Sequence, residues 1–135
     1  MKSTFLVLSF TTICAFIGTY FMNLTAENLE QYMALVAVVM TDGFFGVWAG
    51  TKIEGFQTKK AIKVLKTMVT WIIMLTCILM IEGAFKGTSW LSETIMAPFI
   101  VFQLMSALKN ASRAGLVKNE LLTIILDKID KHKEQ

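Results

Sequence analysis

The residue whose chemistry stands out is Asp42, a carboxylate inside an otherwise uncharged apolar segment over residues 31–51. Asp42, Gly46 and Gly50 are spaced i, i+4 and i+8, so a helix places them on one stripe. Intramembrane acids are costly and usually face a partner or a wet path, while GxxxG spacing lets helix backbones approach closely in lipid. The pattern therefore predicts a membrane helix that associates through this stripe, with a capping aspartate in a soluble turn as the alternative. The small residues beside the carboxylate are Gly43, Gly46, Ala49 and Gly50.

The rest of the sequence offers no constellation for catalysis. It contains no nucleophile–base pair, no phosphate-binding loop and no cluster with metal-ligand spacing. Cys14 and Cys77 lie in apolar runs and are expected to behave as small hydrophobic residues, and His132 has no second ligand near it in the sequence. We expect neither an enzyme nor a bound metal or cofactor.

The composition indicates the class of protein that must position Asp42. The 135 residues allow a single domain, and they are 55% hydrophobic but only 17% charged, against about 25% in an ordinary globular protein. The charges also fall in a few clusters and leave long runs empty. These features predict an all-α, polytopic membrane protein.

Four apolar runs predict transmembrane helices, at about residues 5–24, 31–51, 67–85 and 92–108, within a region that covers residues 1–112. A cleaved signal peptide is the alternative for the first run, which is longer than a typical signal core of about 7–15 residues. Pro98 should kink the fourth helix slightly without ending it.

The connections contain recognisable start and stop signals. Thr25, Thr58 and Ser92 are expected N-caps, and Gly55 and Gly115 are expected to end helices. Residues 58–66 predict an amphipathic helix that lies in the headgroups before the chain turns into the bilayer.

Residues 113–135 predict a cytoplasmic tail with an amphipathic helix, which could lie on the membrane, pack on the bundle or associate with copies of itself. Its expected apolar face consists of Leu121, Leu122, Ile125, Leu126 and Ile129.

Basic residues suggest both a surface and an orientation. Along the chain, ends and connections that are rich in cations alternate with connections that have few. The positive-inside rule then places both termini in the cytoplasm. Nucleic acid is a poor partner for these lysines, because aliphatic side chains and not stacking aromatics lie between them. Anionic lipid headgroups are the expected partner. The predicted membrane-surface residues are Lys52, Lys59, Lys60, Lys63 and Lys66.

The fourth apolar run carries two polar residues, Gln103 and Ser106, three apart and therefore on one side of a helix. Hydrogen bonds between helices are their expected use. With the Asp42 stripe, they complete the predicted set of helix-association or pore-lining residues.

The segment from Ala34 to Val69 resembles the core of the bacteriophage holin family, which also includes clostridial toxin-secretion holins. The matching positions are Asp42, Gly46, Ala49, Lys52, Lys60 and Lys66, with Thr58 in place of a usual serine. A second stretch, FQLMSALKNASRAGL, is similar to the family's second signature at Ser106, Asn110 and Gly115. The departures from that signature are at Phe102, Gln103, Lys109, Val117 and Lys118.

The resemblance, over roughly residues 33–126, implies a lysis protein of the bacterial inner membrane. Such a protein accumulates, forms homo-oligomeric holes at a set time and lets an endolysin reach the cell wall. Two other functions stay open: a small ion channel or proton-coupled transporter that uses Asp42, and a membrane scaffold whose basic segment and tail recruit a partner.

Overall fold

The computed structural model describes residues 1–133, which fold into helices joined by short connections. Four of the helices are long and apolar enough to cross a membrane, and the fifth is short. The predicted all-α fold with four apolar candidate spans is thus confirmed. The helices are α1 (Lys2–Glu27), α2 (Leu29–Glu54), α3 (Thr58–Ala84), α4 (Leu91–Arg113) and α5 (Asn119–Lys133).

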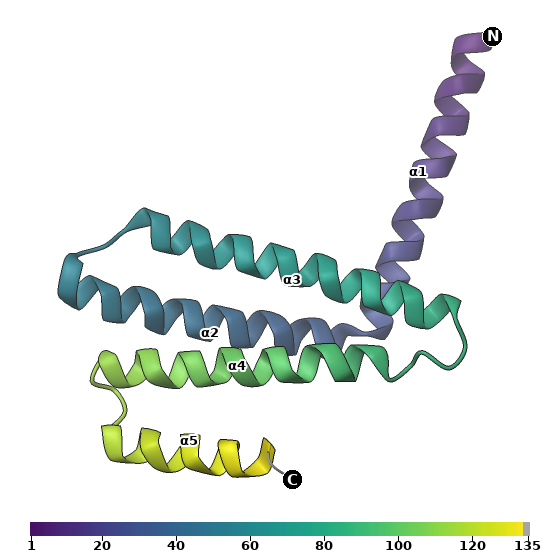
Figure 1. Cartoon of the computed structure of the whole chain (residues 1–135). Coiled ribbons are helices and arrows are strands. Elements are labelled where there is room, and N and C mark those ends of the chain that lie inside the picture. Colours follow the sequence, from purple (N-terminus) through teal and green to yellow (C-terminus); the bar gives the residue numbers. More distant parts are fainter. Residues whose placement is uncertain (134–135) are drawn as a thin grey trace.

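Helices α2, α3 and α4 run side by side and form a bundle (Figure 1). Its apolar core occupies the half where α2 begins, α3 ends and α4 begins. Trp71 stacks on Phe99 there, and the hydroxyl groups of Tyr32 and Thr76 share a hydrogen bond of 2.8 Å. The core residues are Tyr32, Leu35, Val39, Leu75, Ile78, Leu79, Met96 and Phe99.

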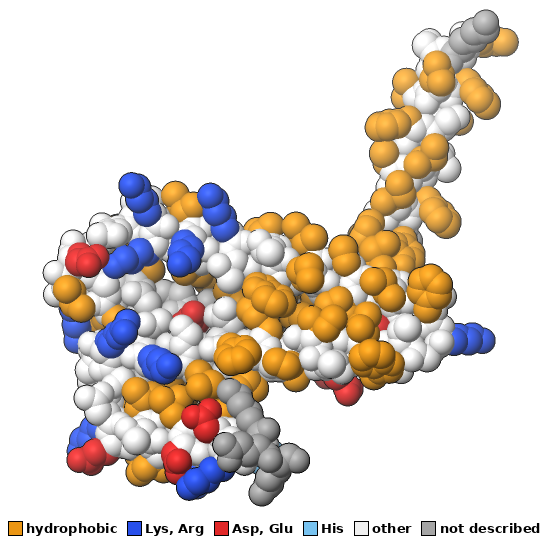
Figure 2. Space-filling model, in the orientation of Figure 1, with side chains coloured by type: hydrophobic (Ala, Val, Ile, Leu, Met, Phe, Trp, Pro, Cys, Tyr) orange, Lys and Arg blue, Asp and Glu red, His pale blue; other side chains and the backbone are white. Residues whose placement is uncertain are grey.

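The outer surface of the helices is also apolar. Large hydrophobic side chains such as Phe44, Ile73 and Phe102 are exposed. Figure 2 shows that hydrophobic side chains in general cover α1 and much of the bundle. A water-soluble monomer rarely exposes apolar patches of this extent, whereas acyl chains would cover them. The distribution therefore fits a bundle surrounded by lipid.

Helix α1 stands away from the bundle and points in a different direction from α2 (Figure 1). Of its described side chains, only Ser9 and Leu24 are even partly covered. The two helices join at Asn28, whose side-chain amide donates to the Leu24 carbonyl oxygen at 2.9 Å. The direction of α1 is thus set mainly by the backbone at this junction, because few of its side chains pack against other helices.

Helix α3 is continuous from Thr58 to Ala84, so the predicted change of direction after residue 66 is wrong. The physical reason is that no glycine or proline interrupts the sequence between Thr58 and Gly83. Residues 58–66 are simply the first turns of the helix that contains the third apolar run.

The three predicted N-caps are also wrong, because the helices begin elsewhere. The Thr25 hydroxyl donates to the Phe21 carbonyl oxygen within α1, and α2 begins after Asn28. Thr58 and Ser92 lie inside α3 and α4, whose N-cap residues are Gln57 and Trp90. The Ser92 backbone N–H donates instead to Glu82 Oε1 at 2.6 Å, so a carboxylate from α3 supports the start of α4.

The predicted helix ends at Gly55 and Gly115 are confirmed, and both glycines have φ of +79°. After Gly115 the chain reverses, and α5 runs back beside α4 (Figure 1). Of the predicted apolar face of α5, Leu121 is exposed, and the partly covered members are Leu122, Ile125, Leu126 and Ile129.

Candidate functional site

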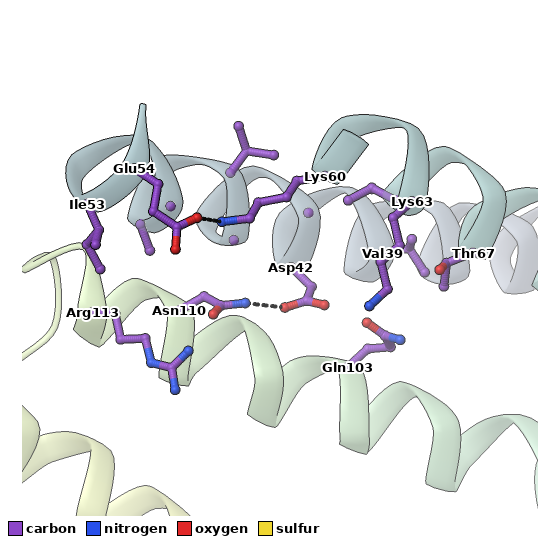
Figure 3. A pocket seen from close by; sticks show the side chains of 16 residues that line it. Val39, Asp42, Ile53, Glu54, Lys60, Lys63, Thr67, Gln103, Asn110 and Arg113 are labelled. Atoms are coloured by element: carbon purple, nitrogen blue, oxygen red, sulfur yellow. Dashed lines mark hydrogen bonds and ion pairs between the residues drawn. The ribbon is translucent and has the colours of Figure 1, made fainter. Parts of the chain in front are cut away.

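The half of the bundle opposite the apolar core contains a cavity of about 600 Å³ between α2, α3 and α4. Figure 3 shows polar side chains from all three helices pointing into it. Its valine and isoleucine walls come from Val39, Val47, Ile53 and Val64. Its charged and amide-bearing side chains are Asp42, Glu54, Lys60, Lys63, Gln103, Asn110 and Arg113.

Asp42 lies on the wall of this cavity and is partly buried. The Asn110 side-chain amide donates a hydrogen bond to Asp42 Oδ1 at 3.0 Å, which joins α2 to α4 (Figure 3). Helix geometry places Asp42 about 18 Å from the end of α2 at Glu54. The carboxylate is therefore well inside the predicted second span and receives its partner from the fourth.

The small residues beside Asp42 bring α2 close to both neighbours within one chain. A Cβ added at Gly43 would lie 2.3 Å from Val64 Cγ1 of α3, and one at Gly46 would lie 3.3 Å from Asn110 Nδ2 of α4. A Cβ at Gly50 would lie 2.9 Å from Lys60 Nζ. Ala49 is buried. The stripe thus packs the monomer, and association between copies through it stays a prediction.

The five predicted surface lysines have different environments. Lys60 Nζ forms an ion pair with Glu54 Oε2 at 2.9 Å, and the Lys52 ammonium donates to the Ala114 carbonyl oxygen at the end of α4. Lys59, Lys63 and Lys66 are all exposed, and of these three Lys63 alone is among the residues that line the cavity. Lys52 and Lys60 therefore tie helix ends together.

The two polar residues predicted for the fourth span also have different environments. Gln103 lines the cavity, while Ser106 is partly buried and is not among the lining residues. Asn110 and Arg113 complete the α4 wall of the cavity, and the sequence reasoning did not include them as site residues. Their spacing contained the signal, because positions 103, 106, 110 and 113 follow the helical repeat along one side.

The chemistry that this cavity can support is solvation and binding. In the described part of the chain, no three His, Cys, Asp or Glu residues gather in a way that could hold a metal ion. The cavity instead presents amide, ammonium, guanidinium and carboxylate groups between membrane-length helices. Such groups are expensive in lipid unless they are paired or hydrated.

Comparison with known proteins agrees with this architecture. The model of the bacteriophage holin family matches residues 19–131, which include α2 to α4 and most of α5. No curated protein and no solved structure matches the chain. The chain therefore belongs to the bacteriophage holin family, whose members are non-enzymatic membrane proteins that form lesions and release endolysin during phage lysis.

Proposed function

We propose that the chain accumulates in the cytoplasmic membrane of its host and that copies assemble there into a lesion through which an endolysin passes. The basic end of the bundle lies in the cytoplasm in this proposal, together with both termini. The positive-inside rule supports this orientation, because Lys86 is the single cation in the connection between α3 and α4. The cations at the other end are Lys52, Lys59, Lys60, Lys63, Lys66, Lys109, Arg113 and Lys118.

The observation that carries the lesion mechanism is the polar cavity inside an otherwise apolar bundle. In a single chain, Asp42, Gln103 and Asn110 line this cavity, which opens to the surface as the hollow between α3 and α4 in Figure 2. If copies associate and the seam between α2 and α4 opens, the same groups can face a water-filled lumen at no cost of exposure to acyl chains. A ring of copies would thus turn the polar cavity of each chain into part of the lining of a hole.

The energies of the seam suit a cooperative trigger. One hydrogen bond between membrane helices contributes about 0.6 kcal/mol on average and at most about 1.7 kcal/mol. Small-residue contacts between copies can offset a cost of that size once the protein is concentrated. A charge that crosses the full membrane potential changes energy by about 2.3 kcal/mol per 100 mV. Concentration and membrane potential therefore act on the same scale as the Asp42–Asn110 bond.

The test is inducible expression of the full chain in a bacterial host with and without a co-expressed muralytic enzyme that has no export signal. We expect an abrupt collapse of the membrane potential, followed by lysis only when the enzyme is present. The enzyme expressed without the chain is the control and should leave the cells intact. An unchanged potential together with retained enzyme would overturn the proposal.

A second function draws support from the way the cavity reaches Asp42 from the basic end of the bundle. A proton or cation pathway would need such access to an intramembrane carboxylate. Asp42→Asn separates the two functions, because asparagine has a similar shape and cannot ionise. A coupled transporter would lose uptake outright, whereas the holin would keep lysing cells with a shifted lysis time.

A further inference from the structure

We propose that the cavity between α2, α3 and α4 is a binding site for the phosphate group of an anionic phospholipid, with Lys63 and Arg113 as its main ligands. The inference rests on the proposed position of the basic end at the membrane surface. It does not depend on lesion formation. It also goes beyond a general attraction of lysines to headgroups, because it assigns a saturable site between helices.

The charges in the cavity favour an anion. Three cations and two carboxylates line it, and one of the cations, Lys60, is paired with Glu54. The other carboxylate, Asp42, accepts a hydrogen bond from Asn110. Among the described residues, no carboxylate lies within ion-pair distance of Lys63 or Arg113. Lys63 and Arg113 thus have no ion-pair partner in the described part of the chain, and the cavity keeps one net positive charge after both carboxylates are counted.

The side-chain types suit phosphate. An arginine guanidinium matches phosphate oxygens with two parallel hydrogen bonds, and a lysine ammonium adds a compact charge. The Lys60 ammonium lies on the same wall as Lys63, one helical turn earlier. Figure 2 shows basic side chains of α3 and α4 on both sides of a hollow at this end of the bundle.

Depth and walls favour a lipid over free phosphate. Lys63 and Arg113 lie just outside the predicted spans 67–85 and 92–108, at the level expected for headgroups. The cavity also has apolar walls at Val39, Val47 and Val64, against which glycerol and the first acyl carbons could pack. Its volume of about 600 Å³ lies within the range of about 300–1,000 Å³ that is common for ligand pockets. A soluble anion would use only the charged part.

An occupied site would add a link between α3 and α4 in the basic half of the bundle. Small residues such as Gly43 and Ala49 pack α2 against its neighbours in this half, together with the Asp42–Asn110 and Lys60–Glu54 bonds. A lipid bound in this cavity would contact both α3 and α4 and hold the two helices together there. Anionic lipid should therefore raise the thermal stability of the folded chain.

The experiment uses the full chain purified in a mild detergent, titrated with short-chain phosphatidylglycerol. Native mass spectrometry counts bound lipid, and thermal unfolding measures stabilisation. The cavity variant is Lys63→Gln with Arg113→Gln. The matched control is Lys59→Gln with Lys66→Gln, which removes the same charge from exposed positions outside the cavity. We expect the cavity variant to bind about tenfold more weakly or worse, since charge-assisted bonds are lost, and the control to bind as the parent does.

Further arms identify the ligand and guard against misfolding. Lys63→Arg with Arg113→Lys keeps both charges and should retain most of the binding. Phosphatidylcholine should bind more weakly than phosphatidylglycerol, and inorganic phosphate should not stabilise the chain at the same concentration. Equal losses in the cavity and control variants would overturn the site, because they would indicate general surface attraction. Equal stabilisation by inorganic phosphate would overturn the assignment to lipid. These outcomes are measured in detergent, so a failed lysis test leaves them interpretable.

Discussion

The Asn110 side-chain amide lies 3.0 Å from Asp42 Oδ1 and joins the middle of α2 to the last turns of α4. This bond links the one carboxylate of the second apolar run to a residue 68 positions later. It lies beside glycines that let α2 approach both neighbours, and beside a cavity that can admit water. Polar pairing and close packing are thus concentrated at one seam, the one that opens in the proposed lesion mechanism.

The first prediction concerns the strength of that seam. Asp42→Ala and Asn110→Ala should each destabilise the chain by roughly 0.5–2 kcal/mol. The double variant should lose less than the sum of the two, by about 0.6–1.7 kcal/mol, because the second substitution removes a bond that is already broken. Reversible unfolding in mixed detergent micelles measures the three values.

The control for this cycle is Asp42→Ala combined with Tyr32→Phe, which removes the distant Tyr32–Thr76 hydrogen bond between α2 and α3. That pair should be additive within about 0.5 kcal/mol. Full additivity of Asp42→Ala with Asn110→Ala would mean that the two side chains do not interact in the folded chain.

The second prediction concerns the approach of α2 to α3. A methyl group at Gly43 would lie 2.3 Å from Val64 Cγ1 and 2.8 Å from Val64 Cγ2. Valine has little rotameric freedom in a helix, so the helices must separate. Gly43→Ala should therefore lower stability by about 1–3 kcal/mol, and Val64→Ala in the same chain should restore part of the loss.

Gly83→Ala is the matched control, because nothing lies within 4 Å of the added Cβ. It should leave the unfolding free energy nearly unchanged or raise it. The packing account is refuted if Gly43→Ala and Gly83→Ala have equal effects on unfolding in detergent.

Much of the fold followed from local sequence patterns. Charge-free runs predicted the four long helices, and Gly55 and Gly115 predicted two of their ends. The glycine stripe predicted close helix contact around Asp42, although the contacts of the stripe in the structure are within one chain. These features depend on hydrophobicity and backbone conformation, which are determined within each segment and do not need its neighbours.

The missed features depend on which helices become neighbours. Nothing local shows that Asn110 bonds to Asp42 or that Arg113 lines the same cavity as Lys63, because both features need the arrangement of α2, α3 and α4. The support for the start of α4 was missed for a similar reason, since Glu82 of α3 accepts the Ser92 N–H. Sequence spacing could place Gln103 and Asn110 on one side of α4, but not choose what that side meets.

The third prediction concerns the turn between α2 and α3. Gly55 has φ of 79° and ψ of 174°, a conformation that is nearly restricted to glycine. Gly55→Ala should cost on the order of 1–3 kcal/mol through backbone strain, although no atom would lie within 4 Å of its Cβ. Thermal unfolding measures the loss, and the turn should also hold the Glu54–Lys60 ion pair less well.

Gly18→Ala is the comparison for this turn, since Gly18 is helical and its added Cβ would also meet nothing within 4 Å. It tests the same change of residue without positive φ. If both substitutions leave stability unchanged, the turn does not require its left-handed glycine.

The last prediction concerns α1, which has the length of a span but does not run with the bundle. Its 26 residues extend about 39 Å, more than the roughly 30 Å of a hydrocarbon core. Phe5, Phe10 and Phe16 are exposed, and its apolar residues do not form one stripe. A helix that is apolar on all sides is best covered by crossing a bilayer, because an interfacial position covers one side only. We therefore expect α1 to turn at Asn28 and to cross the membrane.

Single cysteines test this crossing in a chain that carries Cys14→Ala and Cys77→Ala. A membrane-impermeant maleimide should label Ser89→Cys on intact spheroplasts, because the connection between α3 and α4 faces outward in the proposed orientation. Ser3→Cys and His132→Cys should react only after permeabilisation, which would place both ends of the chain in the cytoplasm. Labelling of Ser3→Cys on intact spheroplasts, with His132→Cys still protected, would mean that α1 stays on the outer face. The bundle would then cross the membrane three times, and α1 would keep the outward direction that it has beside Asn28.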